Sequence, residues 1–498
     1  MSDLTHGDVG NGNSPTSADA RLSQEALPVG LLPREFEAEY LAGAVAPFVL
    51  SGQYVGEIPS LPMIDLSYSK QYAIEPHIWG LLYDGWEPNG DKDGIAVFIQ
   101  GYEYRGPENA RKRIYMSATT PDLIATKYHH KLTRFFDDLF ANRNAGKPLM
   151  KRFYDTYFDM YWDLHLGVRG DAIPAEVRDF GSSFTAFLGY WYPTSEVVHE
   201  HYMRARRTRQ PLQDWVDARV QDMIDGKVPN PDQTFVYYWL KNGGLGEDFR
   251  RKDIVFECFH NLLAFSQWGN TTYNVMARLV PDAGNKTVRS WFERTMTAGP
   301  DVSDGSAFTP LDRFVMELMR TISPNAGSAS LPTRNQDLRG AQYTTVVTPH
   351  SATSEDPRHW TNPCEFDPDR YKNAPTTVDN DETKVRQIGL ARCPFPRDSF
   401  AVKDGRDAHI ENSAFGAAYA TVEGQAFPLC DTAGYAPFGF GYRRCGGEYL
   451  TVEFIKELLR KAWRDGITFN KLDLDNPERR PVGPRTVIDD DIAFRPGA

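Results

Sequence analysis

Apolar residues recur at helical spacing through most of the chain beyond residue 107, and this periodicity constrains the fold more than any other feature. Strand-like runs are short and fall at 95–105 and 341–348. No Gly/Ser-rich or Pro-rich linker divides the chain after residue 30. The sequence also has no internal repeat of about 20–50 residues. The sequence therefore predicts one large, mainly α-helical domain with small β-sheets over residues 30–498. The expected helices are 121–142, 148–164, 213–225, 252–281, 286–297, 309–322 and 448–465.

Composition and charge limit the classes of protein to which the chain can belong. It has 498 residues, of which 41% are apolar and 24% charged, as is typical of a soluble globular protein. Residues 1–29 are rich in Ser, Gly, Asn and Asp and lack the features of a secretory signal, so we expect a disordered tail on a cytoplasmic protein. No stretch approaches the roughly 18 uninterrupted apolar residues of a membrane span. The net charge of −12 disfavours nucleic acid as a partner.

The cysteines do not form a structural framework. Their number is odd, and they include no CxxC pair and no histidine partner at zinc spacing. This pattern argues against disulfides and against a structural zinc site, and it fits a reducing compartment. The five are Cys258, Cys364, Cys393, Cys430 and Cys445.

Cys445 stands in the stretch APFGFGYRRCGGEYL (436–450), among glycines and beside two arginines. A thiol acts as a ligand or nucleophile in its thiolate form, which helix N-termini, backbone N–H groups and nearby cations stabilise. Gly441, Gly446 and Gly447 allow a tight turn with N–H groups directed at the sulfur, and the residues that follow recur at helical spacing. Such a setting suits a nucleophile as well as a metal ligand, so the physical argument leaves both open.

The same stretch resembles the haem-binding loop of the cytochromes P450, F-x-x-G-x-x-x-C-x-G. Phe438, Gly441, Cys445 and Gly447 match it, and Arg443 stands two positions before the cysteine, where that loop also carries an arginine. The resemblance implies a cytochrome P450 fold, with haem b as the cofactor and the Cys445 thiolate as the axial ligand of its iron. Thiolate ligation of haem favours cleavage of an O–O bond.

Two further motifs resemble the same family and follow in its order. Glu317 and Arg320 in FVMELMR form an E-x-x-R pair on one helix face, about one turn apart. Downstream, FDPDRY resembles the family's P-E-R-F element and supplies Arg370 as the third member of a buried Glu–Arg–Arg network. Buried charges have to be paired to be tolerated. The resemblance implies that these three residues hold the fold and do no chemistry.

Cations are expected at the haem propionates, since arginine pairs with carboxylates in a bidentate manner. The resemblance gives this role to Arg443 and to a cation of an earlier helix. ENARKRIYMSATTPDLI (108–124) resembles that helix, with Arg113 as the candidate, although the aromatic residue usual four positions before the cation is missing. The alternatives are Arg111, Lys112 and, in the segment HHKLTR, the pair His130 and Arg134 at the same spacing.

The segment FHNLLAFSQWGNTTYNVM (259–276) resembles the helix that crosses the distal face of haem in this family. There, a small residue pair precedes an acid–Thr pair that relays protons to iron-bound oxygen. Here Thr271 takes the alcohol position, Asn270 replaces the carboxylate, and a bulky Gln-Trp pair stands where small residues are usual. An amide cannot cycle a proton as a carboxylate does. A register shifted by one makes Thr272 the alcohol and still supplies no acid.

Two other stretches depart from the usual P450 pattern. Tyr371 and Cys445 are 74 positions apart, longer than the family's interval, which implies an insertion (372–435) near the thiolate side where electron donors dock. Within it, FGAAYATVEGQAFPL (415–429) has the features of a hairpin. HNLLAF (260–265) resembles a segment of allene oxide synthases, atypical P450s that rearrange fatty-acid hydroperoxides without oxygen or reductase.

Three functional hypotheses follow from these resemblances. The first is a haem-thiolate monooxygenase that inserts one oxygen atom from O2 into an apolar organic substrate, with electrons from a separate ferredoxin or flavoprotein. The second is a peroxide-dependent or hydroperoxide-rearranging enzyme without a reductase, which accounts for Asn270 and for the insertion. The third is a haem-binding sensor without turnover. The aromatic stretches 153–167 and 184–198 are expected in the core; in a pocket they would indicate an apolar or aromatic substrate.

Overall fold

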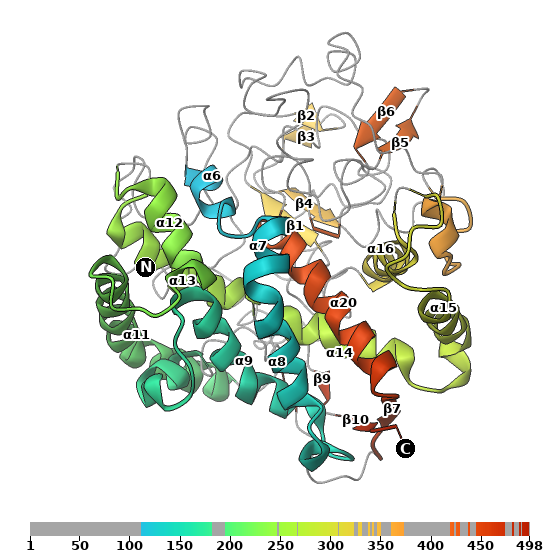
Figure 1. Ribbon diagram of the computed structural model, residues 1–498, viewed down its shortest axis with the longest axis horizontal. Helices are drawn as coiled ribbons and strands as arrows, with labels where there is room; N and C mark the ends of the chain where they lie inside the picture. Colours follow the sequence, from blue (N-terminus) through green and yellow to red (C-terminus); the bar gives the residue numbers. More distant parts are fainter. Residues whose placement is uncertain are drawn as a thin grey trace, which may run out of the picture.

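Helices make up most of the residues that the computed structural model describes, and short antiparallel strand pairs lie beside them (Figure 1). The mainly α architecture with small sheets that the sequence predicts is confirmed. The structure describes residues 111–181, 195–246, 249–265, 267–306, 308–322, 327–330, 337–338, 341–342, 346–349, 360–372, 419–422, 425–428, 437–438, 445–473, 481–482, 488–489 and 491–497.

Most helices lie where helical spacing predicts them. The expected helix at 121–142 begins with α7 and passes through a π-helical turn at Ile124–Tyr128 into α8. The helices are α6 (Arg111–Met116), α7 (Pro121–Leu123), α8 (His129–Leu139), α9 (Leu149–Leu166), α11 (Ser195–Ile224), α12 (Phe235–Gly243), α13 (Arg251–Phe265), α14 (Gln267–Leu279), α15 (Lys286–Thr297), α16 (Pro310–Ile322) and α20 (Glu448–Arg464).

The helix α12 was not expected, because its sequence FVYYWLKNG is rich in aromatic and β-branched residues that favour strands. Capping explains why it is helical. The Thr234 hydroxyl accepts the N–H of Tyr237 at 3.4 Å, and Gly244 ends the helix in the left-handed conformation, with φ 57°. Both caps are visible in the sequence and could have predicted the helix.

The single helix expected at 252–281 is two helices, α13 and α14, in the structure. The two pack against different neighbours: α13 lies along α11, whereas α14 also contacts α15, α16 and the strand β7. A Cβ on Gly269 near the start of α14 would come within 2.0 Å of the Tyr154 hydroxyl of α9. A side chain at position 269 would therefore displace the Tyr154 ring.

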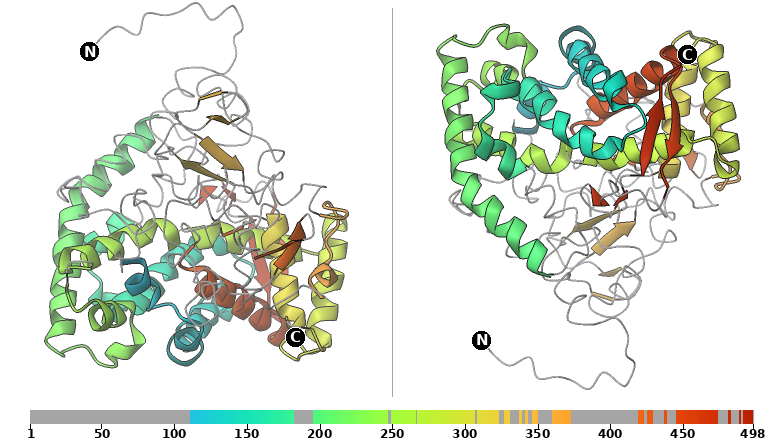
Figure 2. Two further views of the ribbon diagram at one scale, coloured as in Figure 1. Left: turned by 90° about the horizontal axis from the view of Figure 1, so that it is seen from above. Right: turned by 90° about the horizontal axis from the view of Figure 1, so that it is seen from below.

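Each described strand pairs with one other strand, and all pairs are antiparallel. The hairpin expected within 415–429 is confirmed by the pairing of Tyr419 with Pro428 and of Val422 with Gln425. The right-hand view of Figure 2 shows β7 and β10 near the C-terminus, beside α14. The pairs are β1 (Gly327–Ser330) with β4 (Val346–Pro349), β2 (Asp337–Leu338) with β3 (Ala341–Gln342), β5 (Tyr419–Val422) with β6 (Gln425–Pro428), β7 (Thr468–Lys471) with β10 (Ile492–Arg495), and β8 (Pro481–Val482) with β9 (Ile488–Asp489).

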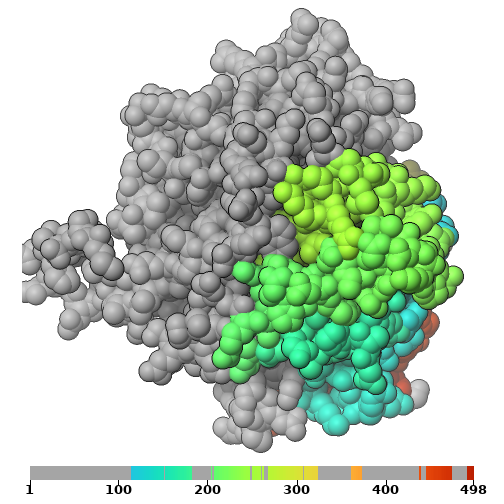
Figure 3. Space-filling model, turned by 90° about the vertical axis from the view of Figure 1, so that its left-hand side faces the viewer, coloured from blue at the N-terminus to red at the C-terminus, as the bar shows by residue number. Residues whose placement is uncertain are grey.

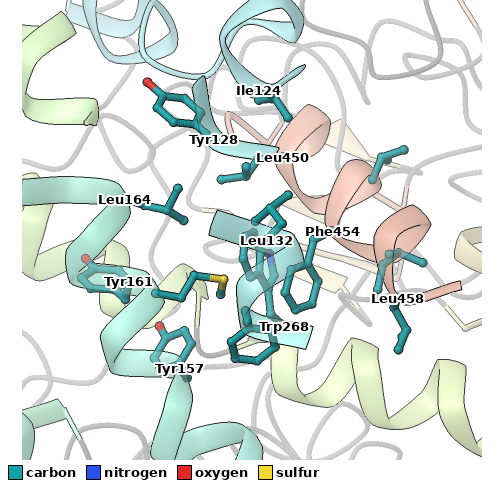
Figure 4. Packing of buried hydrophobic residues seen from close by; sticks show 14 of the residues in the cluster. Ile124, Tyr128, Leu132, Tyr157, Tyr161, Leu164, Trp268, Leu450, Phe454 and Leu458 are labelled. Atoms are coloured by element: carbon teal, nitrogen blue, oxygen red, sulfur yellow. The ribbon is translucent and has the colours of Figure 1, made fainter. Parts of the chain in front are cut away.

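Aromatic rings hold α20 against α8, α9 and α14 in the core. The ring of Phe454 on α20 lies 4.6 Å from that of Phe136 on α8, centroid to centroid. It stacks on Trp268 of α14 at 4.4 Å and meets Phe153 of α9 edge-on at 6.3 Å. Figure 4 shows Trp268 and Phe454 side by side in this cluster. Because α20 follows Cys445 directly, this packing also fixes the position of the cysteine loop.

The aromatic residues of α9 belong to the core, as expected for 153–167. Phe153, Tyr157, Tyr161 and Trp162 are each fully buried. Figure 3 shows the helical side of the molecule, where α11 (green) lies against α9 (teal). None of the helices among the described residues is both long and apolar enough to cross a membrane.

Several predicted features lie outside the described residues. They are the tail at 1–29, the strand-like run at 95–105, most of the aromatic stretch 184–198, and most of the insertion 372–435.

Candidate functional site

The loop that carries Cys445 leads directly into α20. Gly447, the residue before the helix, donates its N–H to the Cys445 Sγ at 3.4 Å. The Cys445 N–H in turn donates to the carbonyl of the buried Phe438 at 2.8 Å. The structure thus brings together Phe438, Cys445 and Gly447 of the sequence motif. The partly buried thiol lies at the N-terminal end of a 17-residue helix, where unpaired N–H groups and the helix dipole stabilise negative charge.

Gly447 does not need to be glycine for the reason expected. Its φ of −100° is open to any residue, and a Cβ there would lie 3.9 Å from Sγ, an ordinary contact. Gly446 and Gly447 do form a turn, and the Gly447 N–H is directed at the sulfur as expected, but this backbone conformation does not require glycine at position 447. Gly441 and Arg443 lie outside the described residues.

The end of α6 and the residues after it lie beside the cysteine loop. The Thr119 hydroxyl donates to the carbonyl oxygen of Gly446 at 3.1 Å. Burial raises the pKa of Tyr115 well above its usual range, and the negative charges of Glu257 and then Cys445 raise it further. Arg113 lies on α6, but its side chain is outside the described part of the chain. Its role at a haem propionate stays a prediction.

A buried chain of hydrogen bonds extends from Tyr115 into the protein. The Tyr115 hydroxyl lies 2.8 Å from Asn261 Oδ1 of α13, and Asn261 Nδ2 lies 3.2 Å from Nε2 of His165 on α9. The other ring nitrogen of His165, Nδ1, is 2.8 Å from the carbonyl of Tyr161. The side chains of Tyr115, Asn261 and His165 are all buried. Three helices are thereby joined beside the cysteine loop.

The carbonyl at the end of this chain fixes the direction of every bond in it. A carbonyl can only accept, so Nδ1 of His165 carries the proton and Nε2 accepts from the Asn261 amide nitrogen. The amide oxygen of Asn261 then faces Tyr115, whose hydroxyl donates to it. The imidazole is neutral because burial lowers the pKa of His165 to about 3.

A second polar cluster surrounds Glu317 on α16. Its side chain is completely buried, and Arg320 donates Nε to Oε2 and Nη2 to Oε1, both at 2.8 Å. Arg370 donates Nε to Oε1 at 3.1 Å, which confirms the buried Glu–Arg–Arg network. Trp360 covers both guanidinium groups, at 5.2 Å from Arg320 and 5.8 Å from Arg370. The remaining donors to the carboxylate are the N–H of Asp367 at 2.9 Å and the hydroxyl of Tyr371 at 3.0 Å.

Solved structures with this arrangement of helices are cytochromes P450. A zebrafish cytochrome P450 with abiraterone matches 90% of this chain and 93% of its own, with a TM-score of 0.57 and 13% identity. A cyanobacterial cytochrome P450 with bound retinoic acid matches 86% and 85%, with a TM-score of 0.56 and 14% identity. The chain has the cytochrome P450 fold. No protein-family model and no curated protein matches the sequence.

On this P450 fold, Thr271 and Asn270 lie near the start of α14. The Thr271 hydroxyl donates to the carbonyl of Gln267 at 3.2 Å, and Asn270 Oδ1 accepts from Asn274 Nδ2 at 3.1 Å. The preceding Trp268 faces α20, because its indole N–H donates to Thr451 Oγ1 at 2.9 Å. This contact explains how a bulky residue is accommodated where small ones are usual. The distal roles of Thr271 and Asn270 stay predictions.

The alternative propionate cations, His130 and Arg134, lie in the N-terminal half of α8. Arg134 lies 3.5 Å from Asp163 Oδ2, a carboxylate that also pairs with the buried Lys131. The His130 side chain is exposed, as expected for an ordinary residue on a helix surface. The pairing with Asp163 accounts for Arg134 without a propionate.

Sequence reasoning missed Thr119, which donates to the cysteine loop, and the buried Tyr115 and His165, which are linked through Asn261. A histidine within the aromatic face of α9 was a visible signal, since a buried imidazole needs polar partners. Its side-chain partner Asn261 is 96 positions away, and Asn261 and Tyr115 are 146 positions apart, so no local pattern indicates these contacts.

Proposed function

We propose that this chain is a haem-thiolate oxidoreductase in which Cys445 is the axial ligand of a haem b iron. The P450 fold supports the proposal, but the observation that carries it is the hydrogen bond from the Gly447 N–H to the Cys445 Sγ at the start of α20. A backbone donor aimed at a sulfur stabilises the thiolate relative to the thiol. That is the form in which cysteine binds a metal.

The residues around Cys445 fit a thiolate ligand. Cys445 is only partly buried, whereas Cys258 is fully buried. Burial raises the pKa of Cys258 well above its usual range, and the Glu257 charge adds to this effect, so that residue is unsuited to the role. Of these two cysteines, Cys445 alone has the environment of a ligand.

Other residues would hold the porphyrin in place. Arg443 and Arg113 are the proposed partners of the two propionates, because a guanidinium pairs well with a carboxylate. Phe438 would help to hold the cysteine loop in place for the haem, since its carbonyl already fixes the Cys445 backbone. When bound, a thiolate-ligated haem supplies activation of oxygen and cleavage of the O–O bond.

The reaction proposed is insertion of one oxygen atom from O2 into an apolar small molecule, with electrons from a separate ferredoxin or flavoprotein. Thr271 is the proposed distal hydroxyl. Since its proton is donated to the Gln267 carbonyl, its oxygen keeps lone pairs that can accept a further hydrogen bond. It can therefore orient a proton donor, such as a water molecule, in the distal pocket.

Asn270 favours a second candidate, an enzyme that uses a peroxide or rearranges a fatty-acid hydroperoxide. A side-chain amide orients a neighbour by hydrogen bonds but releases no proton near neutral pH. An oxidant that arrives already reduced to the peroxide level needs fewer protons and no electron donor. The Asn270 amide is suited to such a substrate.

The haem-thiolate assignment is tested by spectroscopy of the purified protein reduced under carbon monoxide. We expect a red-shifted Soret band for the wild type and its loss, together with loss of haem, in Cys445→Ala. Cys364→Ala is the matched control, because Cys364 is an exposed free cysteine. An unchanged band in Cys445→Ala would contradict the proposal.

The two candidate reactions are separated by their oxidants. One assay supplies O2, NADPH and surrogate redox partners with a set of apolar substrates, and the other supplies a fatty-acid hydroperoxide without reductant. Monooxygenation predicts turnover in the first assay. Turnover confined to the second would replace it by the hydroperoxide reaction, and Asn270→Asp should then shift activity toward the first.

A further inference from the structure

One peptide group beside Cys445 is hydrogen-bonded at both of its ends. The N–H of Gly447 donates to the Cys445 Sγ at 3.4 Å, and the C=O of Gly446 accepts from the Thr119 hydroxyl at 3.1 Å. This carbonyl and this N–H belong to the same amide, the bond between Gly446 and Gly447. Thr119 therefore lies one amide away from the sulfur, although it is 326 positions earlier in sequence.

A hydrogen bond to an amide oxygen strengthens the N–H donor of the same amide. Electron density is drawn toward the oxygen, the nitrogen becomes more positive, and the N–H polarises further, so that linked hydrogen bonds reinforce one another. The effect is greater when the final acceptor is charged, as a thiolate is. Residues that hydrogen-bond to the ligands of a metal change the properties of the metal in this indirect way.

Thr119 is held in the position that this role requires. It is 5% exposed, and its own N–H donates to the Met116 carbonyl at 3.0 Å. Its neighbours are fixed as well, because Ala118 donates to Tyr115 and Thr120 caps α7. The Thr119 hydroxyl also lies 3.4 Å from the Met116 carbonyl, but it has one proton, and the Gly446 oxygen is the nearer acceptor.

We propose that Thr119 is a positioning residue that tunes the Cys445 thiolate through the Gly446–Gly447 peptide. The inference rests on the proposed haem-thiolate function. A stronger N–H bond withdraws charge from the sulfur, so the thiolate donates less electron density to the iron. The reduced iron is then easier to form, and loss of the Thr119 hydroxyl lowers the reduction potential.

The test compares two substitutions in the haem-containing protein. Thr119→Val removes the hydroxyl and keeps the shape, whereas Thr119→Ser keeps the hydroxyl. We expect Thr119→Val to lower the ferrous-to-ferric ratio at a fixed potential by up to about tenfold, or about 59 mV for one electron. The Soret band of the ferrous–carbon monoxide form should shift as well, and Thr119→Ser should resemble the wild type in both measurements.

Thr156→Val on α9 is the matched control. Thr156 is 8% exposed, and its hydroxyl donates to the Arg152 carbonyl at 2.9 Å, so the control loses a similar bond elsewhere. A potential in Thr119→Val equal to that of the wild type, or an equal shift in Thr156→Val, would overturn the inference. Thr119→Ala provides the same readout if the valine variant does not fold.

The proposed function and this inference fail in different ways. A wild-type protein without a thiolate-type carbon monoxide band overturns both. A wild type with that band, together with unchanged potentials in Thr119→Val and Thr119→Ala, overturns only the role of Thr119.

Discussion

Two polar clusters, one around Glu317 and one around Cys445, are built in opposite ways. Glu317 is completely buried, and within the described part of the chain its two oxygens accept five hydrogen bonds from four residues. The Cys445 thiol is partly buried, and the described residues direct one backbone N–H to it, at 3.4 Å. The difference shows that a structural charge is enclosed by close donors, whereas the proposed ligand residue is only partly buried.

The cluster around Glu317 is fully paired because its carboxylate has no contact with water. A buried charge loses its hydration, and only close partners of opposite charge and good geometry compensate for that loss. Arg320 and Arg370 supply the charge, and each also donates to backbone carbonyls, including that of Glu365. Removing the carboxylate therefore leaves two guanidinium groups uncompensated.

Glu317→Gln is expected to have the largest effect, and it tests whether this cluster is structural. Replacing the charge by an amide of the same shape should lower the free energy of unfolding by about 3–5 kcal/mol, as measured by chemical denaturation. Glu293→Gln is the control, because Glu293 forms an exposed i,i+4 pair with Arg289 on α15, where about 0–1 kcal/mol is expected. Equal losses in the two variants would contradict the comparison.

His165→Gln tests the buried chain beside Cys445 through the pH dependence of stability. The pKa of His165 is about 3 in the folded protein, because burial lowers it from 6.5. Between these two pKa values the His165 imidazole binds a proton in the unfolded chain but not in the folded protein. The free energy of unfolding therefore falls as pH falls. We expect His165 to contribute a slope of up to about 1.4 kcal/mol per pH unit between pH 6 and pH 4.

Denaturation of both proteins at several pH values isolates this contribution, since the other titrating groups cancel in the difference. The slope should be smaller in His165→Gln than in the wild type. His130→Gln should change the slope less, because its exposed side chain loses less hydration on folding. An unchanged slope in His165→Gln would mean that the imidazole takes up a proton in the folded state. The hydrogen-bond directions assigned to Tyr115, Asn261 and His165 would then be wrong.

The two clusters also differ in how far the sequence predicted them. The Glu317 network follows from E-x-x-R on an amphipathic helix and from Arg370 in FDPDRY, because short motifs determine both the elements and the charges. The loop motif likewise predicted that Phe438, Cys445 and Gly447 come together. Local patterns of this kind predicted α9, α15, α16, α20 and the β5–β6 hairpin as well.

The surroundings of Cys445 could not be predicted in this way. Tyr115, Asn261 and His165 meet only because α6, α13 and α9 pack together, and sequence periodicity does not specify which helices become neighbours. Trp268 stood out in the sequence only as a bulky residue where small ones are usual, because the sequence does not indicate that its indole turns toward Thr451. Side-chain direction at a helix junction depends on tertiary packing.

Two tyrosine substitutions, with the smallest expected effects, sharpen the comparison. Tyr371 donates to the Glu317 carboxylate at 3.0 Å, and Tyr115 donates to the neutral Asn261 amide at 2.8 Å; both side chains are buried. Bonds to charged groups contribute more than bonds to neutral ones, so Tyr371→Phe should lower the free energy of unfolding by about 2 kcal/mol and Tyr115→Phe by about 1 kcal/mol. Chemical denaturation at pH 7 measures both. A larger loss in Tyr115→Phe would indicate that the chain beside Cys445, and not the Glu317 network, is the more strongly coupled cluster.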